Sequence, residues 1–337
     1  MPLAFDSTSK SDDFITSPVT WSHTCSDTAN LLLVAISVVG SSNTGTCTAV
    51  TYNGVSMTKI KTTTNSNVPN SWYIESTVWG LLEPASGTNT VSATITAPTA
   101  PDYGGSSVSY YNAKQSLTMD ATVSNTGTTS GLLTPSITTV NPGAWIFSHI
   151  LTNEDGSSAS SRVSNKTDRQ TQGLASNLNG GDTTTDTDGV VSPGSNSISY
   201  TYTGGSGATT YIWANTMVSI APALSVITNA PTAFTTTTAT GNGTIDAIAD
   251  TNADERGFVY DTAPKTFPGN VSPASSGYAG AATDTGTYST GAFSKLLTGL
   301  TEGTRYYMRS YVHDSTGYAY GDETTFFTAV SLAWLTG

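Results

Sequence analysis

The sequence predicts an all-β protein built from two β-sandwich domains. Only 11% of the 337 residues are charged, and Ser, Thr, Gly and Asn separate short runs of Val, Ile, Tyr, Trp and Phe. β-branched and aromatic side chains suit a pleated, half-buried surface, while Gly, Asn and Asp supply turns. No window of about eleven residues repeats apolar side chains at helical spacing. We therefore expect strands throughout and little helix.

The first expected domain, residues 1–222, alternates strands with polar loops. Its first buried strand is the run 31–39, and Asn53-Gly54 between two alternating segments predicts a hairpin with a type I′ turn. Further strands are expected at 70–82, 90–96, 106–112, 143–152, 196–202 and 209–220, with 83–89 and 177–189 as loops. About eight to ten strands over this length predict a jelly-roll-like double sheet.

The second expected domain, residues 223–329, begins with a short apolar run that Pro222 and Pro231 bracket. Its strands are expected at 224–228, 235–245, 255–261, 286–297, 304–313 and 317–328. Their number and length predict a second, smaller sandwich.

The stretch LTEGTRYYMRSYVHDSTGYAYGD, from Leu300, resembles the fibronectin type III pattern, in which a Leu precedes a Gly-Thr turn and a Tyr follows it. The residues that match are Leu300, Gly303, Thr304 and Tyr306. The resemblance implies that Tyr306 forms a tyrosine corner, with a buried ring and a hydroxyl bonded to upstream backbone.

Alternation along the same strand predicts which side chains face the core. Met308 and Ser310 are expected to point inward, and Tyr307, Arg309 and Tyr311 outward. The two outward tyrosines are then candidates for a contact face.

The layout as a whole also resembles uncharacterised two-domain proteins of phages and environmental bacteria. The segments NLLLVAISV, VTYNGVSMTKI and WGLLEPASGTNTVSATI carry this likeness, which covers most of the chain. It implies a structural or adhesive role and brings no catalytic residue with it.

The net charge and the lack of targeting signals limit the classes of partner and the locations that we expect. A net charge of −12 repels nucleic acid and anionic lipid, so neither is expected as a partner. The first residues show no basic or apolar region of a secretory signal, and no run approaches the roughly 18 apolar residues of a membrane span. A composition typical of extracellular proteins, rich in Ser and Thr and low in charge, without an export signal predicts a virion protein assembled in the host cytoplasm. An extracellular or cell-surface location, by processing or leaderless secretion, stays open.

The two cysteines are expected to be free and mostly buried. Cys25 and Cys47 flank the ends of the buried strand that begins at Leu31. That strand spans about 26 Å, whereas the α-carbons of a disulfide lie within about 7 Å.

The titratable residues give weak support for catalysis. His23, His149 and His313 lie far apart in the sequence and have no metal-ligand spacing, and His149 is expected to be a satisfied strand histidine. No Gly-x-Ser-x-Gly elbow occurs, although a Ser-His-Asp triad stays open because geometry defines it. Glu75 lies within an apolar strand, on its expected outer face, and Glu154 is expected to be solvated at a strand end.

One acidic segment is a weak calcium candidate. DTTTDTDG places Asp182, Asp186 and Asp188 before a Gly, yet it lacks the spacing and the distal Glu of an EF-hand loop. A solvated acidic loop is the alternative, and no other cofactor is expected.

The tryptophans do not predict a flat sugar platform. Trp72 and Trp79 are an odd number of residues apart and so lie on opposite faces of one strand. Trp21, Trp145 and Trp213 are expected in the core. A host-surface glycan would therefore bind to loops.

The last eight residues, VSLAWLTG, are apolar beyond the end of the second sandwich. Val330, Leu332, Trp334 and Leu335 are candidates for partner docking, because burying such side chains is worth about 1.5 to 3 kcal/mol each. Packing on their own chain is the alternative.

These observations favour a non-enzymatic structural component of a phage particle, either a capsid decoration or a fibre-like appendage. Its expected partners are other virion proteins and further copies of itself, a trimer by analogy with jelly-roll appendages. The alternatives are a bacterial cell-surface adhesin or extracellular filament subunit, and a carbohydrate-binding module or glycan hydrolase.

Overall fold

The computed structural model describes residues 3–41, 45–67, 72–96, 99–155, 161–174, 179–204 and 207–331. Within these ranges strands are joined by turns and one short 3-10 turn, η2 (Pro273–Ser275), and no α-helix occurs. The prediction of an all-β fold is confirmed. None of the described residues belongs to a helix of the length and apolarity needed to cross a bilayer. The chain divides into two compact units that meet between Ala221 and Pro222.

The first half of the first unit is a jelly-roll sandwich. One sheet has the strand order β1-β9-β3-β7-β6 and the facing sheet the order β2-β8-β4-β5. The strands are β1 (Ala4–Lys10), β2 (Val19–Cys25), β3 (Leu31–Ser41), β4 (Thr46–Tyr52), β5 (Val55–Ser56), β6 (Thr58–Asn67), β7 (Trp72–Leu82), β8 (Gly87–Thr96) and β9 (Thr99–Tyr111). Asn53 and Gly54 join β4 to β5 with φ of 49° and 76°, as the predicted type I′ turn requires.

The second half of this unit repeats the same strand order. Its sheet β10-β19-β13-β16-β15 matches β1-β9-β3-β7-β6 position for position, and shorter sheets β11-β18-β14 and β12-β17 lie opposite. The strands are β10 (Ala121–Gly127), β11 (Gly131–Leu133), β12 (Ser136–Thr139), β13 (Trp145–Glu154), β14 (Ser161–Ser164), β15 (Thr167–Leu174), β16 (Asn179–Asp186), β17 (Gly194–Ser197), β18 (Tyr200–Thr203) and β19 (Tyr211–Ile220).

The jelly-roll prediction is therefore confirmed, but the expected number of strands was too low, because the unit contains the fold twice. The segment 177–189 was wrongly expected to be a loop, and most of it is strand β16. Its threonines are β-branched and favour a strand. Gly180 and Gly181 leave room for Val39 and Arg162, which pack closely against the strand on its two sides.

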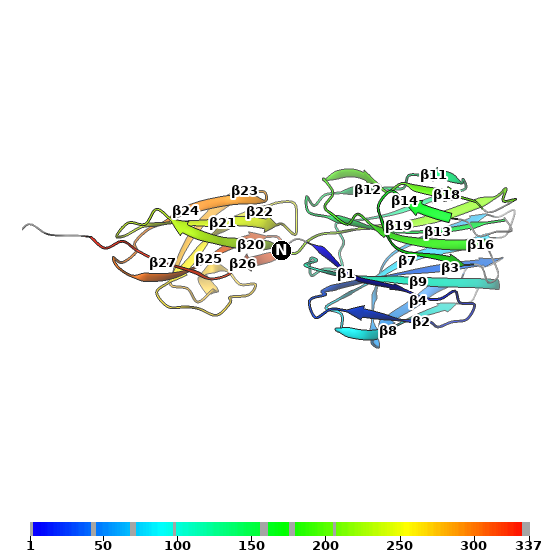
Figure 1. Ribbon diagram of the computed structural model, residues 1–337, viewed down its shortest axis with the longest axis horizontal. Helices are drawn as coiled ribbons and strands as arrows, with labels where there is room; N and C mark the ends of the chain where they lie inside the picture. Colours follow the sequence, from blue (N-terminus) through cyan, green and yellow to red (C-terminus); the bar gives the residue numbers. More distant parts are fainter. Residues whose placement is uncertain are drawn as a thin grey trace, which may run out of the picture. The chain divides into compact units, whose positions relative to one another are not determined.

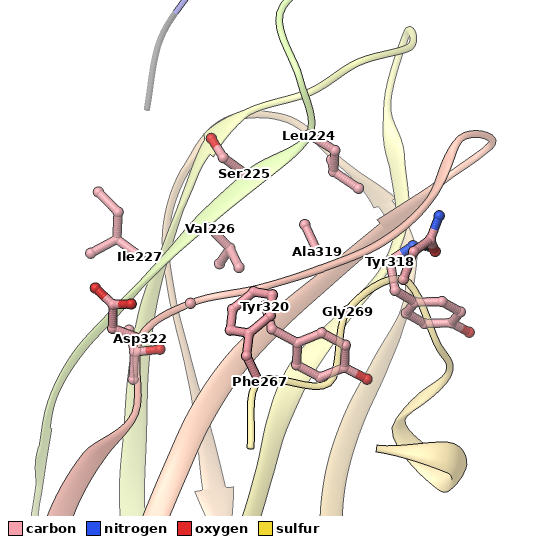
Figure 2. A pocket seen from close by; sticks show the side chains of 13 residues that line it. Leu224, Ser225, Val226, Ile227, Phe267, Gly269, Tyr318, Ala319, Tyr320 and Asp322 are labelled. Atoms are coloured by element: carbon pink, nitrogen blue, oxygen red, sulfur yellow. Dashed lines mark hydrogen bonds between the residues drawn. The ribbon is translucent and has the colours of Figure 1, made fainter. Parts of the chain in front are cut away.

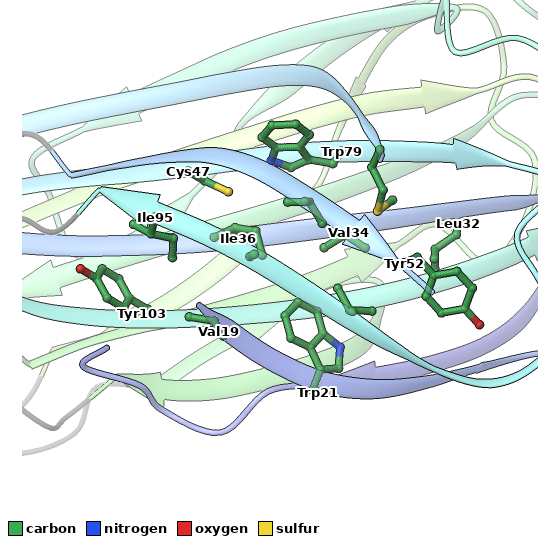
Figure 3. Packing of buried hydrophobic residues seen from close by; sticks show 14 of the residues in the cluster. Val19, Trp21, Leu32, Val34, Ile36, Cys47, Tyr52, Trp79, Ile95 and Tyr103 are labelled. Carbon is green, nitrogen blue, oxygen red and sulfur yellow. The ribbon is translucent and has the colours of Figure 1, made fainter. Parts of the chain in front are cut away.

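The two jelly rolls pack through their five-stranded sheets, with the shorter sheets outside (Figure 1). Leu31 and Leu33 of β3 meet Trp145 and Phe147 of β13 across this interface. The alternate residues of β3 fill the core of the first jelly roll, which Figure 3 shows. Strand β3 is thus buried on both faces, which explains its continuous run of apolar residues.

The second unit has the strand arrangement of a fibronectin type III domain. One sheet is β20-β21-β24, and the other is β23-β22-β25-β26 with β27 also paired to β25. The strands are β20 (Ser225–Thr232), β21 (Ala239–Ala247), β22 (Ala253–Asp261), β23 (Gly280–Tyr288), β24 (Gly291–Leu297), β25 (Arg305–Asp314), β26 (Gly317–Tyr320) and β27 (Thr324–Phe327). Two expected strands, 286–297 and 317–328, are each split in two.

Candidate functional site

A polar seam crosses the interface between the two jelly rolls at its centre. The ring of His149 on β13 is fully buried, with Nε2 2.8 Å from Ser37 Oγ on β3 and Nδ1 2.9 Å from Thr184 Oγ1 on β16. Thr184 also contacts Ser106 of β9. The expectation of a satisfied strand histidine is confirmed. Burial lowers the pKa of His149, so the ring is neutral at pH 7.

The seam continues along the neighbouring strands. Ser76 Oγ on β7 donates to Thr216 Oγ1 on β19 at 2.9 Å, and Thr216 Oγ1 donates to Thr63 Oγ1 on β6 at 2.8 Å. Apolar clusters lie at either end of the interface. A shift of one sheet against the other would leave these buried hydroxyls unpaired, so the seam fixes how the two jelly rolls meet.

A second histidine cluster closes the edge of the first jelly roll. His23 of β2 is 1% exposed; its Nδ1 lies 2.9 Å from Ser9 Oγ and 3.0 Å from Ser107 Oγ, and its Nε2 lies 3.1 Å from Ser109 Oγ. Burial lowers the pKa of His23 to about 4, although Asp6 opposes this shift.

The cluster around His23 contains the residue types of a Ser-His-Asp triad in a different order. Ser109 Oγ donates to Asp6 Oδ2 at 2.6 Å, so the carboxylate holds the serine proton and does not orient the imidazole. In a catalytic triad the carboxylate binds the histidine, which then takes the serine proton. This cluster ties β1 and β9 of one sheet to β2 of the other.

The three candidate calcium ligands do not converge. Asp186 and Asp188 both bind Arg169, at 2.8 and 2.7 Å, and Asp186 also accepts a hydrogen bond from Tyr110 at 2.9 Å. Burial raises the pKa of Asp186 and Arg169 opposes the shift. Asp182 lies farther along the extended strand β16, fully buried, and neither of its oxygens has a hydrogen-bond partner among the described residues. No group of three or more His, Cys, Asp or Glu in the described ranges is placed to hold a metal.

Two glutamates lie in the interior, contrary to the expectation that they face solvent. Glu75 is 2% exposed and accepts hydrogen bonds from Thr46 Oγ1 at 2.7 Å and Cys47 N at 2.8 Å. Glu154 is also 2% exposed and accepts one from Tyr202 at 3.0 Å. Both sit on strands whose two faces are covered by other sheets, so neither the outer face expected for Glu75 nor the solvated strand end expected for Glu154 exists here.

Arg162 is the buried cation near Glu154. Its guanidinium donates to Thr152 Oγ1 at 2.9 Å and to Gln172 O at 3.2 Å, and a Cβ at Gly181 would collide with it. Burial lowers the pKa of Arg162, whereas Asp182, Tyr202 and Glu154 oppose that shift. The glycine is required so that the arginine can pass under β16.

The expected burial of Cys and Trp residues is confirmed. Cys25 and Cys47 are both buried and free, and burial raises the pKa of Cys47 to about 12, so its thiol stays protonated. Three tryptophans lie in the core as expected: Trp21, Trp145 and Trp213. Trp72 and Trp79 pack in different clusters on opposite faces of β7.

Tyr306 of the second unit has the geometry of a tyrosine corner. Its ring is 6% exposed, and its hydroxyl accepts a hydrogen bond from Thr301 N at 3.0 Å. Arg309 and Tyr311 were wrongly expected to face outward. Tyr278 and Gly321 bind Arg309 at 2.9 Å each, and Tyr311 packs against Tyr278 and Tyr320. The segment between β22 and β23 covers this face of β25.

A groove of about 510 Å³ opens between β20 and β26 of the second unit. Below the groove, Thr228 Oγ1 of β20 lies 2.9 Å from Ser310 Oγ of β25. Figure 2 shows Val226 and Ala319 near one another at the centre of the groove, Phe267 beside Tyr320 below them, and Ile227 pointing away at the left. Ile227 is 48% exposed and Phe267 59% exposed. Each of the two strands forms the edge of its sheet.

The proposed docking tail is described only at its start. Val330 is 67% exposed, whereas Leu332, Trp334 and Leu335 lie outside the described residues. Ala329 N donates to Thr235 O and Gly303 N donates to Ala329 O, so the tail leaves the sandwich beside the end of β20.

The groove is the candidate site that the sequence did not reveal. Ile227 belongs to a short run read as an ordinary strand, and the gap beside it depends on the spacing of two distant strands. The sequence carries only a weak signal of it. Phe267 lies between Pro264 and Pro268 in a polar loop, where alone it is an ordinary exposed apolar residue; only its closeness to Ile227 and Ala319 makes an apolar patch.

Comparisons with known proteins give no family. No protein-family model and no curated protein sequence matches the chain. The solved structures that resemble it include the sensor domain of the anti-sigma factor RsgI4 of Pseudobacteroides cellulosolvens, 17% identical, covering 32% of this chain and 95% of that one with a TM-score of 0.22. They also include the FN1-FN3 domains of chicken CNTN1, 10% identical over 97% of this chain and 100% of that one, with a TM-score of 0.23. A third is the A168-A170 segment of titin, 7% identical over 98% and 99%, with a TM-score of 0.20. Scores this low do not support a transfer of function.

Proposed function

We propose that this protein is a non-enzymatic structural component of a phage particle, a capsid decoration or fibre-like appendage that presents its sandwich domains outward. The observation that carries the proposal is the seam of His149, Ser37 and Thr184 between the jelly rolls. It joins two sandwiches into one stiff body, and stiffness is what an appendage needs to hold its loops away from a surface.

The chemistry of the buried groups supports the same role. Both ring nitrogens of His23 and of His149 are occupied by hydroxyls of the chain itself, and Arg169 occupies Asp186. These side chains make contacts that hold the strands together. The partners under this proposal are other virion proteins and further copies of this chain, with a host-surface glycan as a possible target of the loops.

The test is to locate the protein in an infected culture. An antibody raised against the purified chain is used for immunogold electron microscopy on phage particles purified from the lysate, and for blotting of particle and cell-envelope fractions. We expect gold label on particles and co-sedimentation with them. Label confined to the bacterial surface would overturn the proposal in favour of an adhesin or filament subunit.

A glycan-active role is tested separately. A glycan array and a reducing-sugar assay on the purified chain distinguish a binding module or a glycan hydrolase from a structural subunit. Release of reducing sugar that survives further purification would contradict the non-enzymatic part of the proposal.

A further inference from the structure

We propose that the groove between β20 and β26 of one copy receives residues 330–335 of a second copy as an added strand, which joins copies head to tail. The inference rests on the proposed structural role in one respect, that copies of this chain assemble with one another. The contact itself follows from the geometry of the second unit.

The groove offers what an incoming strand needs. β20 pairs only with β21 and β26 only with β25, so neither edge carries a further strand among the described residues, and on β26 Tyr318 N donates to Asn270 Oδ1 at 2.8 Å. Free edges pair readily with an extended peptide, through main-chain hydrogen bonds that do not depend on sequence. The floor and sides are apolar, formed by Val226, Ala319, Ile227 and Phe267. Side chains of alternate residues of the added strand would fill that space.

The tail offers a matching strand. In the extended form Val330, Leu332 and Trp334 share one face, because successive side chains of a strand alternate. Val330 already stands 67% exposed at the point where the tail leaves the sandwich. The segment VSLAWLTG contains no charged side chain.

Charge favours this segment over the rest of the surface as a contact between copies. With 24 acidic and 12 basic residues, two copies repel one another over most of their surfaces. An uncharged strand entering an apolar groove avoids that repulsion. Asp322, at the edge of the groove, is the charged side chain among the groove residues of the described chain.

The position of the two parts makes the contact head to tail. The groove lies at the start of β20, around Val226, whereas the tail leaves beside Thr235, past the end of that strand. β20 has 8 residues and is about 23 Å long at the strand rise. Donor and acceptor therefore lie at opposite ends of one sandwich. Such a contact is heterologous and builds a ring or an open row of copies.

The experiment uses two full-length variants, each defective in one half of the contact. Trp334→Ala removes the largest side chain of the donor, and Ile227→Glu places a charge in the acceptor at an exposed position. Leu132→Glu, at a residue 70% exposed in the first unit, is the matched control. Sedimentation velocity over a range of concentrations, in buffer with at least about 0.15 M salt to screen the net charge, reports the size of each species.

We expect wild type and Leu132→Glu to self-associate, and each defective variant to remain monomeric. A mixture of the two should give a complex of two chains and no larger one, because Ile227→Glu still donates its tail and Trp334→Ala still accepts one. A fluorescent peptide of residues 329–337 should bind Trp334→Ala protein, at least tenfold more weakly after the same Trp→Ala change in the peptide.

Several results would overturn the inference. One is a monomeric wild type at all concentrations, and another is self-association that both substitutions leave unchanged. The inference also fails if the mixture forms no complex and the peptide does not bind. It fails as well if Trp334→Ala lowers thermal stability without altering association. The proposed function does not fall with the inference, because immunogold labelling of particles reports it independently.

Discussion

The two jelly rolls of the first unit share one strand order but hold their cores together differently. The first has a core of aliphatic side chains with Trp21 and Trp79, closed by a continuous sheet, β2-β8-β4-β5. The second is covered by two shorter sheets, and its core combines aliphatic side chains with Tyr200, Tyr202 and Trp213, beside the buried Arg162 and Glu154. The first copy thus combines an apolar core with the buried hydrogen bonds of His23 and Glu75, whereas the second also buries a cation, Arg162.

The difference predicts which kind of substitution destabilises each jelly roll. Loss of apolar volume creates a cavity, whose cost grows with its size. Loss of one partner from a buried polar group leaves the other unsatisfied, which costs the full desolvation of that group. Loss of volume in an apolar cluster and loss of a buried charged partner such as Arg162 should therefore destabilise the first unit by separate mechanisms.

The largest expected effect is the removal of the buried cation of the second jelly roll. Arg162→Met keeps much of the side-chain volume but leaves Glu154 and Asp182 buried without the nearby positive charge. We expect a loss of roughly 3 to 5 kcal/mol in the free energy of unfolding, measured by urea denaturation. Lys295→Met is the control, since Lys295 is 33% exposed beside Asp284 and its exposed pair should contribute less than about 1 kcal/mol. An Arg162→Met protein as stable as wild type would show that the buried cation does not stabilise the second jelly roll.

The next effect belongs to the apolar core of the first jelly roll. Leu32 is fully buried between the sheets, and Leu32→Ala should cost roughly 3 to 4 kcal/mol through the cavity that it leaves. The loss should be the same at pH 5 and pH 8, because no charge is involved. A strong pH dependence of the loss in urea denaturation would contradict a purely apolar mechanism.

The sequence predicted the first jelly roll better than the second, for a physical reason. The run that begins at Leu31 is apolar on both faces and reads as a buried strand without ambiguity. Its counterpart β13 carries His149 and Glu154, and β16 consists of Asn, Gly, Thr and Asp, so the repeated strand order was not visible. Alternation assigns side chains to two faces of a strand but does not say that another sheet covers the second face. That is why the burial of Glu75 was missed. The burial of Glu154 was missed because a strand end predicts contact with solvent, and the groove was missed because it depends on the spacing of two distant strands.

Acid should weaken the first unit through its buried histidines. Burial lowers the pKa of His23 from 6.5 to about 4, so the unfolded chain binds a proton at a higher pH than the folded chain does. The stability that neutral His23 contributes is complete above about pH 6.5 and is lost as the pH falls towards 4, by about 3 kcal/mol. His149 in the seam has the same sign.

The measurement compares the free energy of unfolding at pH 7 and pH 4.5 in wild type and His23→Gln. The difference between the two pH values should shrink in the variant, since carboxylates contribute equally to both proteins. His313→Gln is the control, because His313 is 27% exposed beside Asp254 and outside the jelly rolls. An unchanged pH dependence in His23→Gln would mean that the ring is accessible to protons in the folded state.

The smallest expected effect comes from removing one tyrosine hydroxyl from each jelly roll. The resulting change in stability should have opposite signs in the two. Tyr200 of the second donates to Ser148 Oγ at 2.8 Å, so Tyr200→Phe should lose about 1 kcal/mol. Tyr103 of the first is fully buried, and its hydroxyl has no hydrogen-bond partner in the described part of the chain. Tyr103→Phe removes a buried hydroxyl that gains nothing from the fold, so this variant should be as stable as wild type or slightly more stable. Melting temperatures of the two variants, measured side by side, check the comparison, and a loss of equal size in both would show that the first core also depends on hydrogen bonds.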